Sequence, residues 1–319
     1  MRSRALLIAL TISLFSPFTT AIAAEPKVAI AYDIGFLGDN SFNDAVHLAL
    51  KAAKKKYGLV EPFVREVPTN GTAVDRLTRL RFLAKSGYTL IIAVGPGYRE
   101  TVRRVSMEYT ETQFALINDK ELGQLNISNV FFREDQGAYL AGVLAALQSK
   151  KKSVAFIGSE PELLDSFRSG VKVVSKKVSV INISYPVEIS EVSARLETVD
   201  IAYSTWDGDA SILSLILEKY RGKVRVIVET PDQYFAALPN LAPIILASIN
   251  KSLTKPIDQL VKAALADDAI IDVLDERAGI YGREFNVKNG GITVNFNKKM
   301  DTSTLNRLKV EIAKLSKSA

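Results

Sequence analysis

Short runs of apolar and β-branched residues alternate along the chain with longer stretches in which apolar residues recur every three or four positions. The first pair predicts a strand at Val28–Ala31 and a helix at Phe42–Tyr57, after which Gly58 takes the position that glycine often occupies behind a helix. The same pattern then predicts strands at Leu59–Val67, Thr89–Val94 and Gln113–Asn118, and helices at Asp75–Ser86 and Arg99–Tyr109. This order predicts a parallel sheet with helices on both faces.

The alternation starts again in the second part of the chain. It predicts helices at Gly137–Gln148, Pro161–Val174, Ala210–Lys219 and Ser252–Ala266, and strands at Ser153–Ile157, Val178–Tyr185, Asp200–Ser204, Val224–Glu229 and Ile244–Ile249. A hairpin is then predicted across Gly279–Phe296, with Asn289-Gly290 as its turn, before a polar final helix at Thr302–Leu315. Two doubly wound sheets followed by a return segment agree with a length of 319 residues, which one core seldom serves.

The first 24 residues have the pattern of a secretory signal peptide. Arg2 and Arg4 precede an apolar centre at Ala5–Leu14, and Ala21-Ile22-Ala23 supplies the small residues of a cleavage site. A membrane span is the competing interpretation, but serine and proline interrupt an apolar run that is shorter than the roughly 20 residues a span needs. We therefore expect a soluble, exported, periplasmic protein.

Composition narrows the chemistry further. The sequence contains no cysteine, which argues against disulfides, thiolate metal sites and a lipid anchor on cysteine. Its only histidine, His47, lies in a helical pattern, where we expect an ordinary surface side chain. Neither a zinc site nor a nucleophile activated by histidine is therefore predicted. The net charge of +6 at pH 7 is too small and too dispersed to favour a nucleic-acid partner.

Polar and aromatic residues collect where the predicted strands end. Ligands of open parallel sheets bind beyond the carboxyl ends of the strands, so these segments are expected to line one binding edge. The segment from Tyr32 to Asp44 carries carboxylates, amides and phenylalanines where a plain turn would serve. The later strand ends are Gly95-Pro96-Gly97, Asn118-Asp119, Thr205-Trp206-Asp207, Thr230-Pro231-Asp232 and Asn250-Lys251. Trp206, the only tryptophan, is expected to stack on a ligand there.

Other interpretations of these residues remain open. Ser41-x-x-Asp44 has the spacing of a helix capping box, which would account for both side chains without a ligand. A pair of the carboxylates could serve a glycosidase or a nucleosidase, or could hold calcium. The spacings of the Rossmann and Walker phosphate loops are absent, so no nucleotide cofactor is predicted.

Six segments, in order along the chain, resemble those of the basic membrane protein, or PnrA-like, family of ABC-transporter nucleoside-binding proteins. Asp33-x-Gly35-x-x-x-Asp39-x-Ser41-Phe42-Asn43 is similar to the opening D-x-G-G-x-x-D-x-S-F-N of that family. The other segments are Phe114–Asp119, Phe132–Gly142, Phe167-x-x-Gly170, Asp232-Gln233 and Ser248-x-x-Lys251. The likeness extends over most of the chain, from about Lys27 to Leu315.

The resemblance implies an α/β protein of the type I periplasmic-binding-protein fold, with two Rossmann-like lobes joined by a three-segment hinge. The signal peptide would be 1–24, the first lobe 25–125 plus about 250–272, and the second lobe 126–249 plus about 273–319. By analogy, the base of a nucleoside would lie against Phe42, with Asn43 and Asp39 at its edge, and Asp119 and Lys251 at the ribose. The other implied ligand-binding residues are Asp33, Ser41, Trp206, Thr230 and Asp232.

The resemblance further implies a monomer that performs no catalysis and needs no cofactor or metal, and that delivers a small molecule to an ABC-transporter permease. The chain departs from the pattern at Phe36, which replaces a glycine, and at Thr230, which replaces an aspartate. It is also shorter than the family norm between Val174 and Asp200, so Tyr185 or Trp206 would supply the second stacking ring. Alternatives are a nucleosidase, a sugar-binding or other heteroaromatic-binding member, and a sensory or interaction protein that has lost transport.

Overall fold

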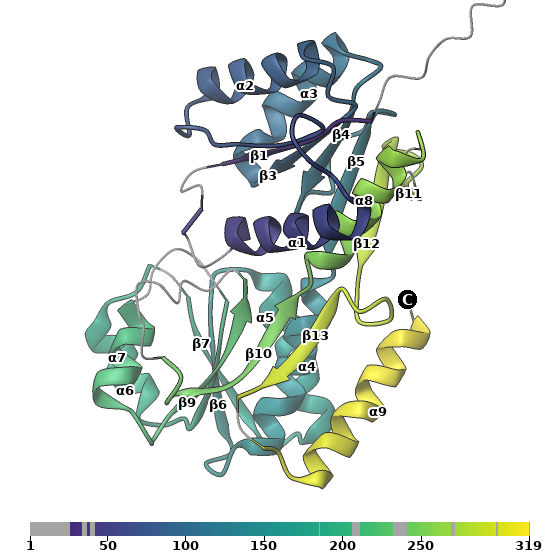
Figure 1. Cartoon of the computed structure of the whole chain (residues 1–319). Coiled ribbons are helices and arrows are strands. Elements are labelled where there is room, and N and C mark those ends of the chain that lie inside the picture. Colours follow the sequence, from purple (N-terminus) through teal and green to yellow (C-terminus); the bar gives the residue numbers. More distant parts are fainter. Residues whose placement is uncertain are drawn as a thin grey trace, which may run out of the picture.

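The elements of the computed structural model form two lobes, one above the other in Figure 1. It describes residues 26–33, 37–38, 42–184, 186–205, 211–231, 241–268, 272–297 and 299–318. These residues form two sheets, one at the centre of each lobe, and nearly all neighbouring strands within a sheet are parallel. The prediction of two successive parallel sheets with flanking helices is confirmed.

The first lobe has its strands in the order β11-β12-β5-β4-β3-β1-β2. Its elements are β1 (Val28–Tyr32), α1 (Phe42–Tyr57), β2 (Val64–Val67), α2 (Ala73–Lys85), β3 (Leu90–Val94), the 3-10 helix η1 (Pro96–Tyr98), α3 (Arg99–Glu108), β4 (Gln113–Ile117), β5 (Ile127–Phe132), α8 (Thr254–Leu265), β11 (Asp272–Asp275) and β12 (Ile280–Phe285). Helices α1 and α8 pack against each other near the second lobe (Figure 1).

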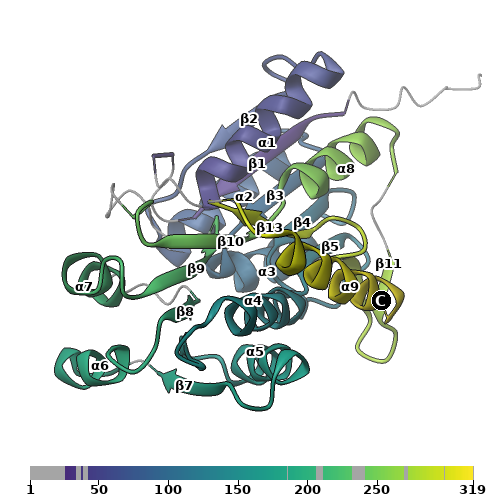
Figure 2. The same cartoon turned by 90° about the horizontal axis from the view of Figure 1, so that it is seen from below.

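The second lobe has its strands in the order β13-β10-β9-β8-β6-β7. Its elements are α4 (Glu134–Gln148), β6 (Ser153–Ile157), α5 (Pro161–Val174), β7 (Ser179–Ile183), α6 (Ile189–Leu196), β8 (Ile201–Ser204), α7 (Ser211–Lys219), β9 (Arg225–Thr230), β10 (Ile245–Lys251), β13 (Ile292–Phe296) and α9 (Thr302–Ser318). Helices α4 and α5 lie side by side, and α9 packs along α4 (Figure 2).

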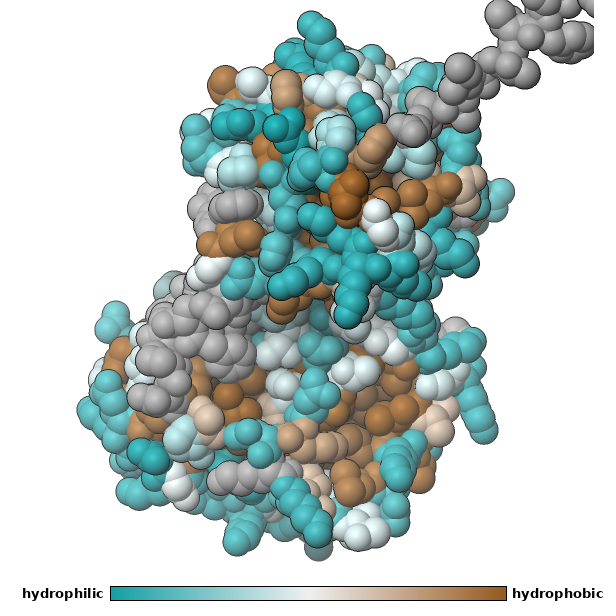
Figure 3. Space-filling view, viewed as in Figure 1, coloured by the Kyte–Doolittle hydropathy of each residue, from teal (hydrophilic) through white to brown (hydrophobic). Residues whose placement is uncertain are grey.

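Within the described residues, three segments carry the chain between the lobes. They run from β5 to α4, from β10 to α8, and from β12 to β13. Backbone hydrogen bonds join them: the amide of Arg133 donates to the carbonyl of Phe285 at 2.9 Å, and that of Ser252 donates to Gly291 at 2.9 Å. The surface narrows at this junction (Figure 3). Two α/β lobes joined by three crossing segments are the arrangement that the family resemblance implies.

Two boundaries and one motif differ from prediction. Strands β5 and β12 belong to the first sheet, so the first lobe extends to Phe132 and to Phe285 rather than ending near residues 125 and 272. The predicted hairpin across Gly279–Phe296 is wrong, because β12 pairs with β5 and β13 pairs with β10 in the other sheet. The turn near Asn289-Gly290 exists, but it connects strands of different lobes.

Helix α9 is held on α4 by a buried carboxylate. The side chain of Glu311 is fully buried, and it accepts a hydrogen bond from the hydroxyl of Tyr139 at 2.8 Å. The ammonium of Lys314 and the guanidinium of Arg307 each lie 3.0 Å from it. Burial alone would raise the pKa of Glu311, but the bonds from Lys314 and Tyr139 lower it below its ordinary value.

This lowered pKa predicts a pH-dependent role for Glu311. A carboxyl whose pKa is lower in the folded state stabilises the fold above its unfolded pKa, and this contribution is lost as the pH falls. We expect Glu311→Gln to cost about 1–3 kcal/mol of unfolding free energy at pH 7 and clearly less at pH 3. Urea unfolding at both pH values measures this, with the exposed Glu276→Gln as control. An equal cost at both pH values would contradict the prediction.

Candidate functional site

The carboxyl ends of both sheets point toward the junction between the lobes. Strand β5 runs directly into α4 of the second lobe. The parallel pairs β5–β4, β4–β3 and β3–β1 give the other three strands the same direction. In the same way β10 runs into α8 of the first lobe, with β9, β8 and β6 parallel to it. The strand-end residues of the two lobes therefore approach the junction from opposite sides.

Asp33 follows β1 and is held by an arginine of its own lobe. Nε and NH2 of Arg76 donate to one oxygen of Asp33 at 2.8 and 2.6 Å, and both side chains are largely buried. A Cβ at Gly97 would lie 2.2 Å from the other oxygen of Asp33, so this close approach requires a glycine. Asp33 thus joins the end of β1 to α2 through Arg76. Its contact with a ligand stays a prediction.

Asp119 follows β4 and has a fully buried side chain. It accepts hydrogen bonds from the guanidinium of Arg99 and from the backbone amide of Glu121, the latter at 2.9 Å. The bond to Asp119 raises the pKa of Arg99 above its ordinary value. The preceding residue, Asn118, has a φ of 63°, in the left-handed region that asparagine tolerates better than most residues. The turn therefore fixes the carboxylate at the strand end.

The start of α1 lies at the same edge. Phe42 is its first residue and is half-buried against the core, and Asn43 is 5% exposed. Asp44 accepts a hydrogen bond from the amide of Gly38 at 2.8 Å. Four predicted site residues lie outside the described residues: Asp39, Ser41, Trp206 and Asp232.

Lys251 ends β10 and is buried between carboxylates. Only 4% of its side chain is exposed, and Nζ donates to Oε1 of Glu134 at 2.7 Å. A carboxylate oxygen of Glu229 lies 3.7 Å from the same nitrogen. Burial alone would lower the pKa of Lys251, but the charges of Glu229 and Glu134 raise it above its ordinary value. The ammonium therefore stays charged and ties the first residue of α4 to the end of β10.

Glu229 and Tyr203 extend this ion pair into the core. The hydroxyl of Tyr203 donates to Glu229, and its ring packs against Phe156 and Phe167 with centroids 5.8 and 5.5 Å away. Burial raises the pKa of both Glu229 and Tyr203. Sequence reasoning singled out none of Glu134, Glu229 and Tyr203. The available signal was an acidic residue at the end of the otherwise apolar run of β9.

Thr230 lies beside this cluster in β9, in register with Asn250 of β10. Its hydroxyl donates to Oδ1 of Asn250 at 3.3 Å. This is the position at which the resemblance expects an aspartate. The strand end therefore carries a neutral hydrogen-bonded pair there, and its charged groups are Glu229 and Lys251 instead.

His47 is not the ordinary surface residue that the sequence predicted. Its side chain is about one-third exposed, and Nδ1 lies 2.7 Å from an oxygen of Glu66. The hydroxyl of Tyr32 donates to that same oxygen at 2.6 Å. The helix pattern could not show this contact, because Glu66 comes from β2.

The family profile described as ABC transporter substrate-binding protein PnrA-like matches residues 26–228. The chain belongs to this family. This PnrA-like protein therefore shares the family and the fold of the substrate-binding proteins of ABC transporters. Substrate-binding proteins of this family act outside the cytoplasm and are not enzymes. The match ends immediately before Glu229, so Thr230 and Lys251 lie beyond it.

Curated relatives match this PnrA-like protein over part of their length. It is 32% identical over 155 residues to basic membrane protein A1 of Borrelia garinii subsp. bavariensis, covering 47% of this chain and 44% of that one. It is 23% identical over 190 residues to the ABC transporter nucleoside-binding protein BmpA of Lactococcus lactis subsp. cremoris, covering 58% and 54%. The matches thus span about half the length of these relatives.

Solved structures are similar over nearly the whole chain. A solute-binding protein of an ABC transporter system from Conexibacter woesei superposes with a TM-score of 0.68 at 18% identity, covering 92% of this chain and 97% of that one. A solute-binding protein from Aeropyrum pernix K1 gives a TM-score of 0.62 at 19% identity, covering 92% and 86%. At this identity the likeness establishes the fold of the PnrA-like protein.

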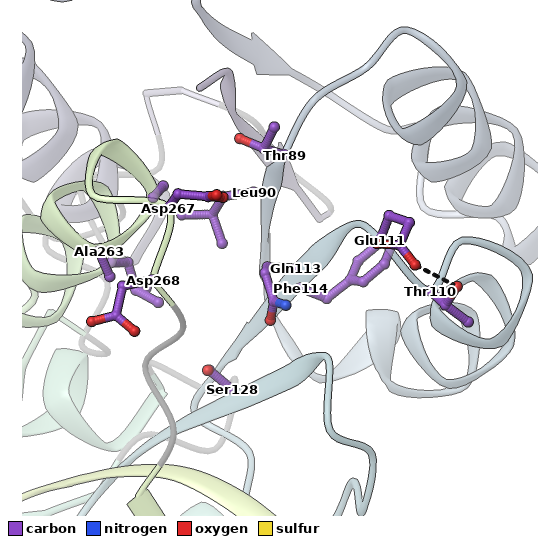
Figure 4. Close-up of a pocket in the computed structure, with 12 residues that line it drawn as sticks. Thr89, Leu90, Thr110, Glu111, Gln113, Phe114, Ser128, Ala263, Asp267 and Asp268 are labelled. Carbon is purple, nitrogen blue, oxygen red and sulfur yellow. Dashed lines mark hydrogen bonds between the residues drawn. The ribbon is translucent and has the colours of Figure 1, made fainter. Parts of the chain in front are cut away.

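A separate cavity of about 250 Å³ lies at the opposite edge of the first sheet (Figure 4). It is lined by the amino ends of β3, β4 and β5, which include Gln113 and Ser128, and by the end of α8 with Asp267 and Asp268. It is therefore not part of the strand-end site. Among the residues that the structure describes, no group of three or more potential metal ligands is present, and no helix is long and apolar enough to cross a membrane.

Proposed function

We propose that this protein binds a nucleoside, with purine nucleosides preferred, between its two lobes and delivers it to the permease of an ABC importer. The observation that supports this most directly is that Phe42 and Asn43 form the first turn of α1, a helix on the side of the first lobe that faces the second lobe (Figure 1). The name of the relative BmpA, a nucleoside-binding protein, agrees with it.

The chemistry of the edge suits a flat base attached to a sugar. An aromatic ring such as Phe42 gains stacking energy from a heteroaromatic base. The amide of Asn43 can both donate and accept at the edge of a base. Hydroxyl groups of a ribose need polar partners when they are buried, and Asp119 and Lys251 are already oriented at the two strand ends by Arg99 and Glu134. Lobe closure about the three crossing segments would bring these groups together.

The protein is further proposed to act as a monomer that is exported through its N-terminal segment and is free of a lipid anchor. Its partner would be the permease of the importer. Export rests on the signal-like pattern of the first residues, the lack of a lipid anchor on the absence of cysteine from the sequence, and the permease partner on the family. The monomeric state stays a prediction.

Direct binding tests the function. Ligand-free protein is titrated calorimetrically with adenosine, guanosine, inosine, cytidine, uridine, free bases and pentoses, and purine nucleosides are expected to bind most tightly. Phe42→Ala is expected to weaken binding about tenfold, because an aromatic contact contributes roughly 1 kcal/mol beyond its buried area. Phe82→Ala, at a half-exposed phenylalanine of α2, should leave binding unchanged. Binding of pentoses alone, or of no nucleoside, would contradict the proposal.

A further inference from the structure

The cavity at the amino ends of β3, β4 and β5 has a buried apolar floor. Its volume is about 250 Å³, and it lies between these strand ends and the end of α8 (Figure 4). Leu90, Phe114 and Leu260 line it, and each is at most 4% exposed. We call these three residues the apolar floor. A hydrocarbon group that contacts them is removed from water, which is favourable in proportion to the apolar area that it buries.

The exposed part of the lining is acidic. Asp267 and Asp268 follow α8, Glu111 precedes β4, and all three residues are exposed. Among the described residues that line the cavity, none is a lysine or an arginine. Helix α8 also ends here, and the carboxyl end of a helix carries partial negative charge. The cavity therefore combines an apolar floor with a rim that favours a cation.

Asp267 is held beside the cavity by the turn that ends α8. Its φ is 52°, in the left-handed region, and its amide donates to the carbonyl of Ala264 at 3.3 Å. In Figure 4 its carboxylate points from the end of α8 toward the strand ends. Among the residues that the structure describes, no lysine or arginine forms an ion pair with Asp267. This carboxylate differs in that respect from Asp33 and Asp119, which are both paired with arginine.

We propose that this cavity binds a small organic cation, namely a primary ammonium group carried on a short hydrocarbon chain or a single ring. The ammonium lies at the acidic rim beside Asp267, and the hydrocarbon part contacts the apolar floor. A metal ion would gain nothing from the apolar floor, and an anion would be repelled by the carboxylates. The cavity lies at the opposite edge of the first sheet from the strand-end site, so this ligand is additional to the proposed nucleoside.

The test uses three ring compounds of nearly equal size that differ in charge. Benzylamine is a cation at pH 7, benzyl alcohol is neutral and benzoate is an anion. Each is titrated into the isotope-labelled full-length protein, and the amide NMR shifts report both the place of binding and the affinity. Benzylamine should shift amides of the lining residues and bind about fivefold more tightly than benzyl alcohol, as one charge interaction at an exposed rim implies. Benzoate should bind more weakly than benzyl alcohol.

Variants assign the binding to this cavity. Asp267→Asn removes the charge and keeps the shape, and asparagine tolerates the left-handed region. It should weaken benzylamine binding several-fold and leave benzyl alcohol unchanged. Ala264→Leu enlarges a side chain of the cavity wall and should weaken the binding of both compounds. Glu162→Gln, at an exposed position of α5 in the second lobe, is the control and should change neither affinity.

The outcomes also separate this inference from the proposed function. Equal affinities for the three compounds, or an unchanged affinity of Asp267→Asn for benzylamine, would overturn the role of charge. Shifts at Phe42 and Asn43 in place of the lining residues would assign benzylamine to the strand-end site and overturn the second site. Calcium chloride that shifts the lining amides when benzylamine does not would overturn the organic cation. None of these results bears on nucleoside binding, which is measured without any of these compounds.

Discussion

Replacing Lys251 by methionine is expected to lower the free energy of unfolding by about 3–5 kcal/mol at pH 7, because it removes one partner of a buried ion pair. The methionine has a similar length, so the change in volume is small. It leaves the carboxylate of Glu229, which is 4% exposed, without the ammonium that offsets its burial. It also breaks the bond between Lys251 and Glu134, which ties β10 to the start of α4.

The pH dependence of this defect identifies its cause. Without the ammonium, the pKa of Glu229 in the folded state should rise further above its value in the unfolded chain. A carboxyl whose folded pKa is raised destabilises the fold at pH values above its unfolded pKa, so the loss caused by Lys251→Met should shrink as the pH falls toward 4. Chemical unfolding of both proteins between pH 4 and pH 8 measures this.

Two further variants complete the experiment. Lys251→Met combined with Glu229→Gln should recover much of the lost stability, because the uncompensated charge is gone. Lys262→Met, at an exposed position on α8, should change the stability by no more than about 0.5 kcal/mol. A similar loss in Lys251→Met at every pH, with no recovery in the double variant, would show that packing rather than charge sets the cost.

The elements that the sequence predicted well are those whose pattern and ends are both local. Helix α1 spans Phe42–Tyr57 as predicted, because its apolar residues recur at helical spacing and Gly58, with a φ of 68°, ends it. Strand β5 was missed, because Ser128 and Asn129 interrupt its apolar run. Asn129 is nevertheless fully buried, and its side chain donates to the carbonyls of Leu122 and Tyr281. The contact with Tyr281 forms only when β12 pairs with β5.

The error over the hairpin has a similar origin. Alternating residues on both sides of Asn289-Gly290 favour two paired strands when only the local sequence is considered. In the structure both strands are satisfied by other neighbours, β5 for β12 and β10 for β13. The sequence contains no local signal for a turn that crosses between lobes.

The candidate site was predictable in position and only partly in content. The rule for strand ends located Asp33, Asp119, Thr230 and Lys251, because it depends only on which strands are parallel. It could not show that Arg76 and Arg99 neutralise the two aspartates, since these contacts join elements that are separate in sequence. The contact between Lys251 and Glu134 likewise depends on how the start of α4 lies against the end of β10.

The second large effect is expected for Gly142→Ala in α4. A Cβ at this position would lie 2.1 Å from the backbone oxygen of Phe167 in α5. Gly170 of α5 has the same relation to α4, since its Cβ would lie 2.0 Å from the oxygen of Tyr139. The two glycines therefore let the helices touch through their backbones. In Figure 2 these helices run side by side. Both glycines belong to segments that resemble the family, and their role is packing.

Adding a methyl group at Gly142 must push the helices apart, because backbone atoms cannot rotate away as a side chain can. Alanine gains about 1 kcal/mol of helix propensity over glycine. Overpacking against rigid backbone atoms costs about 3 kcal/mol, occasionally more. We therefore expect a net loss of about 2 kcal/mol or more in chemical unfolding, and a similar loss for Gly170→Ala.

Gly137→Ala, in the same helix, is the graded control for Gly142→Ala. Its Cβ would lie 2.6 Å from a methyl group of Ile249, which can shift, so its cost should be smaller. Ser169→Ala, at an exposed position of α5, should change the stability little. Equal stabilities for Gly137→Ala and Gly142→Ala would contradict the backbone contact. A cost confined to Gly142 and Gly170 would show that these two glycines of the family-like segments allow the close backbone contact between α4 and α5.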